Sequence, residues 1–332
     1  MKVAFIGAGR WALALALKLS EQKFSIALYD TNPKAIERLL STRHHPDLPE
    51  NAQIPEAITI TNELNPVLTQ AEMVVFALPS TSLAEAAERV KEELKESGVR
   101  LVVSASKGID PKSKKRLSVV LKSIFPSLPV VVLAGPAIPY DVALGDPTSL
   151  VAVSEDENAA RFVQDTFTTT NLRVYFHTDV VGTELAAAFK NVIAIAAGIA
   201  DGLGLKLNAK SALLTRGLAE ITRLGLALNA NPLTFAGLAG MGDLIVTAFS
   251  PHSRNHQLGM AIGKGMTLTQ AQESLSGVAE GVATARTGRE LAQKLRVAMP
   301  ITDEVYRILY EGTKPEESIE RLLKRPLKKE FY

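Results

Sequence analysis

The sequence of 332 residues contains no cysteine, which excludes several kinds of chemistry at once. Such a chain forms no disulfide framework, no thiolate nucleophile and no cysteine-bound metal site. The chain also has little net charge. Its 37 Lys and Arg residues nearly balance its 35 Asp and Glu residues, so the formal net charge at pH 7 is +2. Because nucleic acids and anionic membranes attract strongly basic surfaces, we expect neither as a partner.

Targeting and metal-binding signals are missing as well. The chain opens on an apolar strand-like run instead of a basic stretch with a signal core, and no apolar run approaches the length needed to cross a bilayer. We therefore expect a cytoplasmic protein without a membrane span. The histidines have no spacing typical of metal ligands, so we predict no metal site and place them at the surface or in loops. They are His44, His45, His177, His252 and His256.

The composition that remains is that of an ordinary folded protein. Hydrophobic residues make up 46% of the chain and charged residues 22%, close to the usage of globular domains. A chain of 332 residues exceeds the size at which one hydrophobic core usually stops growing. Two domains are therefore expected.

The first half alternates short apolar runs with amphipathic helical stretches, a pattern typical of parallel strands joined by crossover helices. The run Met73–Ala77 is apolar throughout, so helices should cover both of its faces. This predicts an α/β fold with a doubly wound, Rossmann-type sheet. Strands are predicted at Val3–Ile6, Ser25–Tyr29, Met73–Ala77, Leu101–Ser104, Val130–Leu133, Ser149–Val153 and Arg173–His177, with helices between them, for example at Trp11–Ser20 and Leu83–Glu96.

From about Val181 the strand pattern gives way to Ala- and Leu-rich stretches with helical spacing. Glycine-rich breaks at Gly198–Gly204 and Gly237–Gly242 are expected to separate helices and to let backbone approach a ligand closely. Helices are predicted at Thr183–Ala200, Ala209–Leu228 and Ala283–Leu295.

These patterns divide the chain into a dinucleotide-binding Rossmann domain over residues 1–179 and an all-α substrate-binding domain over residues 180–332. The basic end, residues 324–329, is interpreted as a solvated tail.

A glycine motif follows the first predicted strand and opens the first helix. Gly7, Gly9 and Ala12 match G-x-G-x-x-A, in which the glycines permit a tight turn and close approach to a pyrophosphate. Asp30 ends the second strand, where a carboxylate accepts hydrogen bonds from an adenosine ribose and favours NAD over NADP. The alternatives are a turn that serves packing alone and, for Asp30, a cap of the helix that Pro33 opens.

Further polar segments lie at positions suited to ligands. Residues 104–109 and 134–137 follow the carboxyl ends of two strands, the edge where open α/β sheets bind ligands. Other such segments are residues 185–192, 240–244, 253–255 and 277–281. Taken in order, from Met1 to about Tyr310, these segments resemble the NAD(P)-dependent glycerol-3-phosphate dehydrogenase family. Residues 190–198 are similar to the catalytic helix of that family, and residues 208–217 to the segment after it.

The resemblance implies reduction of dihydroxyacetone phosphate to sn-glycerol 3-phosphate with NAD, or with NADP, in the supply of glycerophospholipid biosynthesis. It implies that Lys190 is the proton donor and acceptor. Substrate contacts are implied for Lys107, Gly135, Ala137, Lys190, Asp243, Ser253, Arg254 and Asn255. Cofactor contacts are implied for Arg10, Trp11, Lys107, Pro139, Arg254, Val278 and Glu280, beside the motif residues Gly7, Gly9 and Asp30.

The chain departs from the family pattern at three of these positions. Ala12 stands where many members carry Gly, a tolerated variant of the fingerprint. Ala137 replaces Ser, which removes a hydroxyl near the substrate, and Pro139 replaces Ala, which removes a backbone donor near the cofactor. These changes bear on site detail rather than on the reaction.

Elementary chemistry supports the role of Lys190 as proton donor and acceptor. Reducing a ketone places negative charge on its oxygen, and a nearby cation both stabilises that charge and supplies the proton. Burial in an apolar helix, with Lys107 as a second cation, should lower the pKa of Lys190 toward neutrality. Asp243 can orient the ammonium group, and Thr247 shares its face if a helix continues there. The alternative is a lysine that extends to water.

Arg254 offers planar donors to a phosphate, and Ser253 and Asn255 add further donors. With Lys107 this set suits a phosphate dianion better than a carboxylate, although each charge alone could be a solvated surface group. The second hypothesis is a related Rossmann reductase of a small 2-keto or 3-hydroxy acid, of the ketopantoate reductase kind. A third is a non-catalytic nucleotide sensor, which would have no use for Lys190 with Asp243.

A homodimer is the expected assembly, because symmetric dimers are the commonest oligomers of soluble enzymes.

Overall fold

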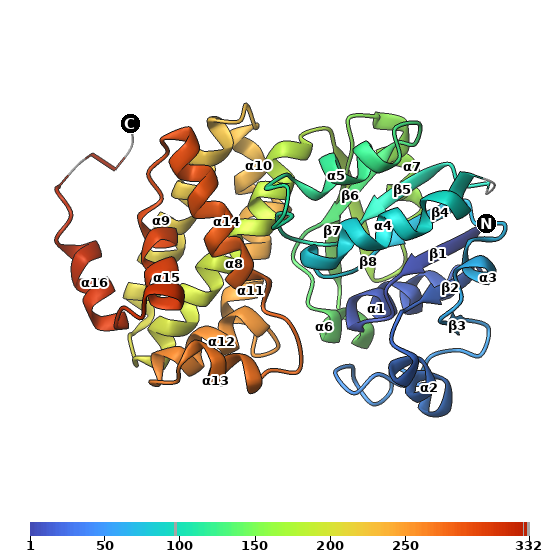
Figure 1. The fold of residues 1–332 in the computed structure, drawn as a ribbon, viewed down its shortest axis with the longest axis horizontal. Helices are drawn as coiled ribbons and strands as arrows, with labels where there is room; N and C mark the ends of the chain where they lie inside the picture. The colour runs from blue at the N-terminus through green and yellow to red at the C-terminus, as the bar shows by residue number, and fades with distance from the viewer. Residues whose placement is uncertain (96–97, 328, 331–332) are drawn as a thin grey trace.

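The computed structural model describes residues 1–95, 98–327 and 329–330. Figure 1 shows two lobes, an N-terminal sheet with helices on its faces and a C-terminal bundle of helices. One eight-stranded sheet has the order β3-β2-β1-β4-β5-β6-β7-β8. Its strands are β1 Lys2–Ile6, β2 Ser25–Tyr29, β3 Thr59–Thr61, β4 Met73–Phe76, β5 Leu101–Ser104, β6 Val130–Ala134, β7 Thr148–Val153 and β8 Leu172–His177.

Helices cover both faces of the sheet and then build the second lobe alone. Those of the first lobe are α1 Arg10–Ser20, α2 Pro33–Thr42, α3 Leu64–Leu68, α4 Ser80–Lys95, α5 Leu117–Ile124, α6 Pro139–Leu144 and α7 Glu157–Phe167. Those of the second are α8 Val180–Gly202, α9 Leu207–Leu226, α10 Pro232–Ala236, the π-helical turn η1 Leu238–Gly242, α11 Asp243–Phe249, α12 Arg254–Gly263, α13 Leu268–Glu273, α14 Glu280–Leu295, α15 Pro300–Glu311 and α16 Pro315–Leu323.

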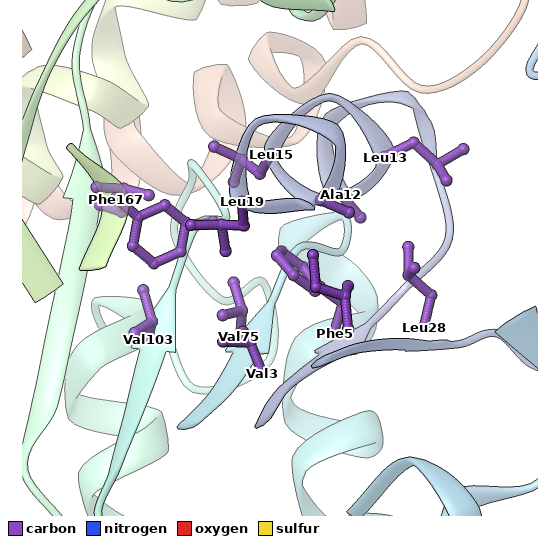
Figure 2. Close-up of a cluster of buried hydrophobic side chains, with 14 of the residues drawn as sticks. Val3, Phe5, Ala12, Leu13, Leu15, Leu19, Leu28, Val75, Val103 and Phe167 are labelled. Carbon is purple, nitrogen blue, oxygen red and sulfur yellow. The ribbon is translucent and has the colours of Figure 1, made fainter. Parts of the chain in front are cut away.

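The doubly wound arrangement follows from strands that are apolar on both faces. Side chains of α1, α2 and α7 form one core with one face of the strands, and those of α3, α4 and α5 form another core with the opposite face. Figure 2 shows the first core, in which Leu15 and Leu19 of α1 and Phe167 of α7 lie against Phe5 and Val75 of the strands. All five are fully buried.

Two features of the sheet differ from the expectation. β7 runs antiparallel to β6, whereas the other neighbouring strands pair in parallel. The connection between them carries only the six-residue α6, about 9 Å of helix, which is too short to return the chain to the opposite edge of the sheet. The short edge strand β3 was not predicted, because only Ile60 of its three residues is buried.

The second lobe is organised around α8. Twenty of its residues are buried, and α9, α11, α12 and α14 pack around it. The expectation that no apolar run reaches membrane-spanning length is wrong for this helix, which has 23 residues and a mean hydropathy of 1.5 over its most apolar window. That window is 89% buried inside the fold, as in the core helix of a globular domain.

Both predicted glycine breaks separate helices, since α8 ends at Gly202 and the stretch Gly237–Gly242 lies between α10 and α11, but Gly198 lies inside α8. α8 continues through Gly198. A side chain at this position would overlap the carbonyl oxygen of His256 in α12, so only glycine fits there. Gly259 of α12 meets the backbone of α8 in the same way, so these glycines permit close helix packing. The second predicted break, Gly237–Gly242, contains the turn η1.

The remaining helix predictions differ from the structure by a few residues at their ends, except that the predicted end of α4, Glu96, lies outside the described residues. The histidine prediction is wrong for His256, which is 5% exposed and lies in α12, where its Nε2 atom is 2.7 Å from Asp201 Oδ2. His177 ends β8 and is half-buried. Both belong to regular elements rather than to loops.

Candidate active site

Lys190 lies at the centre of a buried polar cluster between the two lobes. Its Nζ atom donates to Asp243 Oδ1 and to Thr247 Oγ1, each at 2.5 Å. Asp243 and Thr247 share one face of α11, one turn apart. The second carboxylate oxygen of Asp243 accepts from Lys107 Nζ at 2.6 Å, and Lys107 also donates to the carbonyl oxygen of Gly135 at 3.0 Å. Asp243 is 0% exposed, so it holds two lysines without contacting solvent.

This environment shifts the protonation of Lys190. Burial, with the nearby charge of Lys107, lowers the pKa of the Lys190 ammonium to about 7, while Asp243 opposes the shift. Thr247 accepts from Lys190 and donates its own hydroxyl proton to the carbonyl oxygen of Asp243 at 2.6 Å. The hydroxyl is thereby fixed as an acceptor toward Lys190. Near neutral pH this amine can both donate and accept a proton.

A cleft of about 530 Å³ opens between the lobes over this cluster. Among the predicted substrate residues, those that line it are Lys107, Ala137, Lys190, Thr247, Ser253, Arg254 and Asn255. Gly135 and Asp243 are outside the lining: the carbonyl oxygen of Gly135 accepts from Lys107, and the carboxylate of Asp243 accepts from Lys107 and Lys190. Within the described chain, no group of three or more His, Asp or Glu side chains is placed to hold a metal ion.

Ser253, Arg254 and Asn255 form the start of α12. Ser253 is the N-cap, and its hydroxyl accepts from the backbone N–H of His256 at 3.3 Å. Asn255 Nδ2 donates to Asn191 Oδ1 at 3.0 Å, and Asn255 Oδ1 accepts from Gly281 N at 2.9 Å. The cleft thus meets a helix N-terminus, where backbone N–H groups and the helix dipole favour an anion.

The glycine motif shapes the opposite part of the cleft. Gly7 has φ +107°, and a Cβ there would lie 2.7 Å from the carbonyl oxygen of Ala77. A Cβ on Gly9, the N-cap of α1, would meet nothing within 4 Å, so the backbone is open on that side. The turn and the helix N-terminus therefore leave space for a phosphate group.

Asp30 lies beside this turn, in a separate hollow of about 150 Å³ that Gly7 also lines. Its Oδ2 atom accepts from Ala8 N at 3.0 Å, and its Oδ1 atom accepts from Asn32 N at 2.9 Å. The alternative interpretation of Asp30 as the cap of α2 is wrong, because Asn32 is the N-cap and accepts from Lys34 N.

A cation at the cleft mouth leaves part of its hydrogen-bonding capacity unused. Arg10 Nε is buried and has no hydrogen-bond partner among the described residues. Burial and the neighbouring Arg254 lower the pKa of Arg10 to about 10, opposed by Asp47. Trp11 Nε1 donates to the carbonyl oxygen of Ala105 at 3.1 Å, which fixes the ring at the cleft wall. Open backbone, a helix N-terminus and buried cations together fit an anionic dinucleotide.

Comparison with known proteins gives one family over nearly the whole chain. The N-terminal model of NAD-dependent glycerol-3-phosphate dehydrogenase matches residues 2–160, and the C-terminal model of the same family matches residues 179–320. The chain belongs to the NAD-dependent glycerol-3-phosphate dehydrogenase family.

Individual members agree with this assignment. The glycerol-3-phosphate dehydrogenase (NAD(P)+) of Thermoanaerobacter sp. (strain X514) is 44% identical over 332 residues, covering 100% of this chain and 99% of its own. That of Desulfitobacterium hafniense (strain Y51) is 42% identical over 99% of this chain and 93% of its own. The crystal structure of glycerol-3-phosphate dehydrogenase from Coxiella burnetii superposes with a TM-score of 0.93, at 31% identity over 98% of this chain and 99% of that chain.

In this glycerol-3-phosphate dehydrogenase family member, the predicted cofactor residues divide between the two hollows. Gly9, Arg10, Trp11, Lys107, Pro139, Arg254, Val278 and Glu280 line the cleft, and Gly7 and Asp30 line the smaller hollow. Pro139 is the first residue of α6, where a helix needs no backbone donor, so the substitution costs the helix nothing.

The contacts that join the lobes were not predicted from the sequence. Glu280 of α14 accepts from the Ser80 backbone N–H at 3.1 Å and from the Ser80 hydroxyl at 2.5 Å, at the start of α4. Glu184 of α8 accepts from Ser118 N at 2.8 Å, in the first turn of α5. Each carboxylate of the helical lobe thus accepts hydrogen bonds from N–H groups at the start of a helix of the sheet lobe, which have no partner within that helix. No role was predicted for Asn191, which also lines the cleft.

Proposed function

We propose that this chain reduces dihydroxyacetone phosphate to sn-glycerol 3-phosphate with NAD(P)H and catalyses the reverse oxidation. The observation that carries the proposal is Lys190, held by Asp243 and Thr247 inside the cleft whose other side is the Arg254 turn. Full-length similarity to glycerol-3-phosphate dehydrogenases at 42% and 44% identity supports this reaction over that of a ketopantoate reductase.

Lys190 supplies the proton in this proposal. An ammonium group has three N–H donors, of which Asp243 and Thr247 accept two. The third donates to the substrate carbonyl oxygen as negative charge develops on it. In the reverse direction the neutral amine accepts the hydroxyl proton. Lys107 adds a second positive charge near the same oxygen and, through Asp243, is fixed relative to Lys190.

The N-terminus of α12 binds the phosphate. Arg254 supplies a planar guanidinium, and Ser253 and Asn255 supply polar groups at the same turn. A substrate with a single carboxylate uses fewer of these donors. This is why we favour a phosphorylated ketone over a small keto acid.

A nicotinamide dinucleotide, when bound, supplies or accepts the hydride at the substrate carbon. Gly7, Gly9 and the N-terminus of α1 form the pyrophosphate site, with Arg10 and Trp11 beside it. Asp30 contacts the adenosine ribose and favours NAD. Lys107, Pro139, Arg254, Val278 and Glu280 complete the cofactor-lining set.

The wider context belongs to the same proposal. The dinucleotide-binding domain spans residues 1–179 and the substrate-binding domain residues 180–332, since the last strand ends at His177 and α8 begins at Val180. The enzyme acts in the cytoplasm as a homodimer and supplies glycerophospholipid synthesis.

One assay tests the function. NADH oxidation is followed with dihydroxyacetone phosphate, unphosphorylated dihydroxyacetone and ketopantoate in parallel. We expect turnover with the phosphorylated ketone and a much lower kcat/KM with the other two. Preferred turnover of ketopantoate would overturn the proposal.

A further inference from the structure

A carboxylate that the proposed reaction does not use lies in the cleft. Asp47 lines it together with two arginines of the proposed anion sites, Arg10 and Arg254. Arg10 begins α1 of the sheet lobe and Arg254 begins α12 of the helical lobe, so the two guanidinium groups come from opposite lobes. Within the described chain, neither guanidinium forms a hydrogen bond or an ion pair. Asp47 is thus a negative charge beside two unpaired positive ones.

Asp47 is half-buried and is held in place by the loop between α2 and β3. Its neighbour Leu48 is 3% exposed, packs in the core of the sheet lobe and donates its backbone N–H to the carbonyl oxygen of His45 at 2.9 Å. The backbone N–H of Asp47 donates to His45 Nδ1 at 3.1 Å. Asp47 Oδ2 accepts from the hydroxyl of Ser276, in the loop between α13 and α14, at 3.1 Å. The carboxylate is therefore fixed to both lobes.

The negative charge of Asp47 acts on both arginines. Burial and the charge of Arg254 lower the pKa of Arg10 to about 10, and Asp47 opposes this shift. Arg254 lies against the loop that carries Ser276, since a Cβ on Gly277 would overlap Arg254 Nη1. Its guanidinium is therefore beside the residue that holds the Asp47 carboxylate, and this carboxylate opposes the lowering of the pKa of Arg254 by burial.

Asp47 differs from Glu280, the other carboxylate among the described residues that line the cleft. Glu280 also acts on Arg254, but both of its oxygens accept from Ser80, through the backbone N–H and the hydroxyl. Asp47 has one donor in the described chain, the Ser276 hydroxyl, so its second oxygen has no hydrogen bond. Two like charges roughly 8 Å apart change a binding constant about fivefold to thirtyfold at an effective dielectric of about 20 to 40. A phosphate that binds the arginines therefore meets a repelling charge.

We propose that Asp47 limits the affinity of the cleft for phosphate groups, because its fixed negative charge offsets part of the attraction of Arg10 and Arg254. The inference rests on the proposed function, in which these arginines bind the substrate phosphate and the cofactor. Partial neutralisation lets a phosphorylated product leave a cleft that otherwise holds it on two unpaired guanidinium groups. If Asp47 instead accepted a hydrogen bond from a ligand, its removal would weaken binding, so the sign of the effect separates the two roles.

Calorimetric titration of the full-length protein with inorganic pyrophosphate at low salt tests the proposal. Asp47→Asn keeps the size of the side chain and removes its charge, so Kd should fall at least about fivefold. Glu50→Gln removes an equal charge from an exposed position of the same loop outside the lining, and should leave Kd unchanged. The gain in Asp47→Asn should shrink in about 1 M sodium chloride, where the Debye length is about 3 Å. Unchanged or weaker binding by Asp47→Asn, an equal gain in Glu50→Gln, or a gain that salt does not reduce would overturn the proposal.

Two further measurements separate charge from the contact between the lobes and from the reaction itself. Ser276→Ala removes the hydrogen bond and keeps the carboxylate, so Kd should change less than about twofold. A gain equal to that of Asp47→Asn would show that the bond, not the charge, limits binding. With saturating NADH, Asp47→Asn should also lower the KM for dihydroxyacetone phosphate and leave kcat/KM for unphosphorylated dihydroxyacetone unchanged; an unchanged KM contradicts the inference. No turnover of dihydroxyacetone phosphate by the wild type would refute the proposed function, while the pyrophosphate titration would still decide the role of Asp47.

Discussion

The two sides of the cleft present different groups to a ligand, mainly backbone on the sheet side and charged side chains on the helical side. On the sheet side, open backbone at Gly9 and the N-terminus of α1 form the part of the cleft proposed for the cofactor. On the helical side, buried charges do the bonding: Lys190 of α8 donates to the fully buried Asp243 of α11, which also accepts from Lys107 of the sheet lobe. Backbone donors are insensitive to most substitutions, whereas a buried ion pair fails when one partner is removed. Substitutions should therefore reduce turnover on the helical side and alter cofactor choice on the sheet side.

The largest effect is expected at Lys190. Lys190→Ala removes the proton donor, so kcat should fall by roughly a hundredfold to ten-thousandfold, the range for general acid catalysis. NADH binding, followed by the fluorescence of the bound cofactor, should remain nearly intact. The matched control is Lys210→Met, which also removes a buried lysine from its carboxylate, Asp201, but outside the cleft. A Lys190→Ala enzyme with near-normal kcat would refute the role.

A smaller effect is expected at Arg254. Arg254→Ala should lower kcat/KM for dihydroxyacetone phosphate by a factor equivalent to about 2 to 5 kcal/mol, the range for a lost buried charged contact. The loss for unphosphorylated dihydroxyacetone should be far smaller, because that ketone makes no phosphate contact. Arg286→Ala, which removes an arginine over Tyr310 away from the cleft, is the control. Equal losses on both ketones would mean that Arg254 serves the cofactor or the fold.

The pH dependence sharpens the comparison further. Ketone reduction needs the protonated Lys190, so kcat/KM should fall about tenfold per pH unit above the pKa of about 7. Oxidation of glycerol 3-phosphate needs the neutral amine, so its kcat/KM should fall about tenfold per unit below that pH. Lys190→Arg keeps a permanent charge and should lose the break near pH 7. Profiles that change with the same sign in both directions would contradict the assignment.

The sequence was most informative where one local pattern fixes one structure. Apolar runs predicted seven of the eight strands, because a strand covered on both faces leaves no polar alternation. The same runs carry no information on direction, which is why the antiparallel β7 was not foreseen. The packing role of Gly198 was not foreseen, because the backbone of α12 that requires a glycine there lies far away in the sequence.

The site shows the same limit. The i, i+4 spacing of Asp243 and Thr247 predicted their common face, and the family-like helix pointed to Lys190. The Glu280–Ser80 contact joins residues 200 positions apart, and no local pattern announces it. His256 was placed at the surface because its partner Asp201 belongs to another helix. Long-range partners decide which charged residues are buried, and a single sequence does not reveal them.

The smallest effect is expected on the sheet side, where Asp30 should favour NADH over NADPH. Two backbone N–H groups, of Ala8 and Asn32, hold its carboxylate in place. Two like charges about 4 Å apart repel by roughly 4 kcal/mol at an effective dielectric of 20. Solvent and side-chain rearrangement reduce this figure, and Arg89, which lines the same hollow in an ion pair with Glu85, can turn toward a 2′-phosphate.

Even a third of that repulsion corresponds to about a tenfold preference in kcat/KM for NADH. Asp30→Ala should reduce the ratio, and Asp30→Asn, which removes the charge and keeps the size, should reduce it similarly. Glu37→Gln, on the exposed side of α2, removes an equal charge farther along the chain and should leave the ratio unchanged. Steady-state kinetics with both cofactors decide the matter: equal use by the wild type, or a ratio that Asp30→Ala does not move, would show that backbone and not this carboxylate governs cofactor choice.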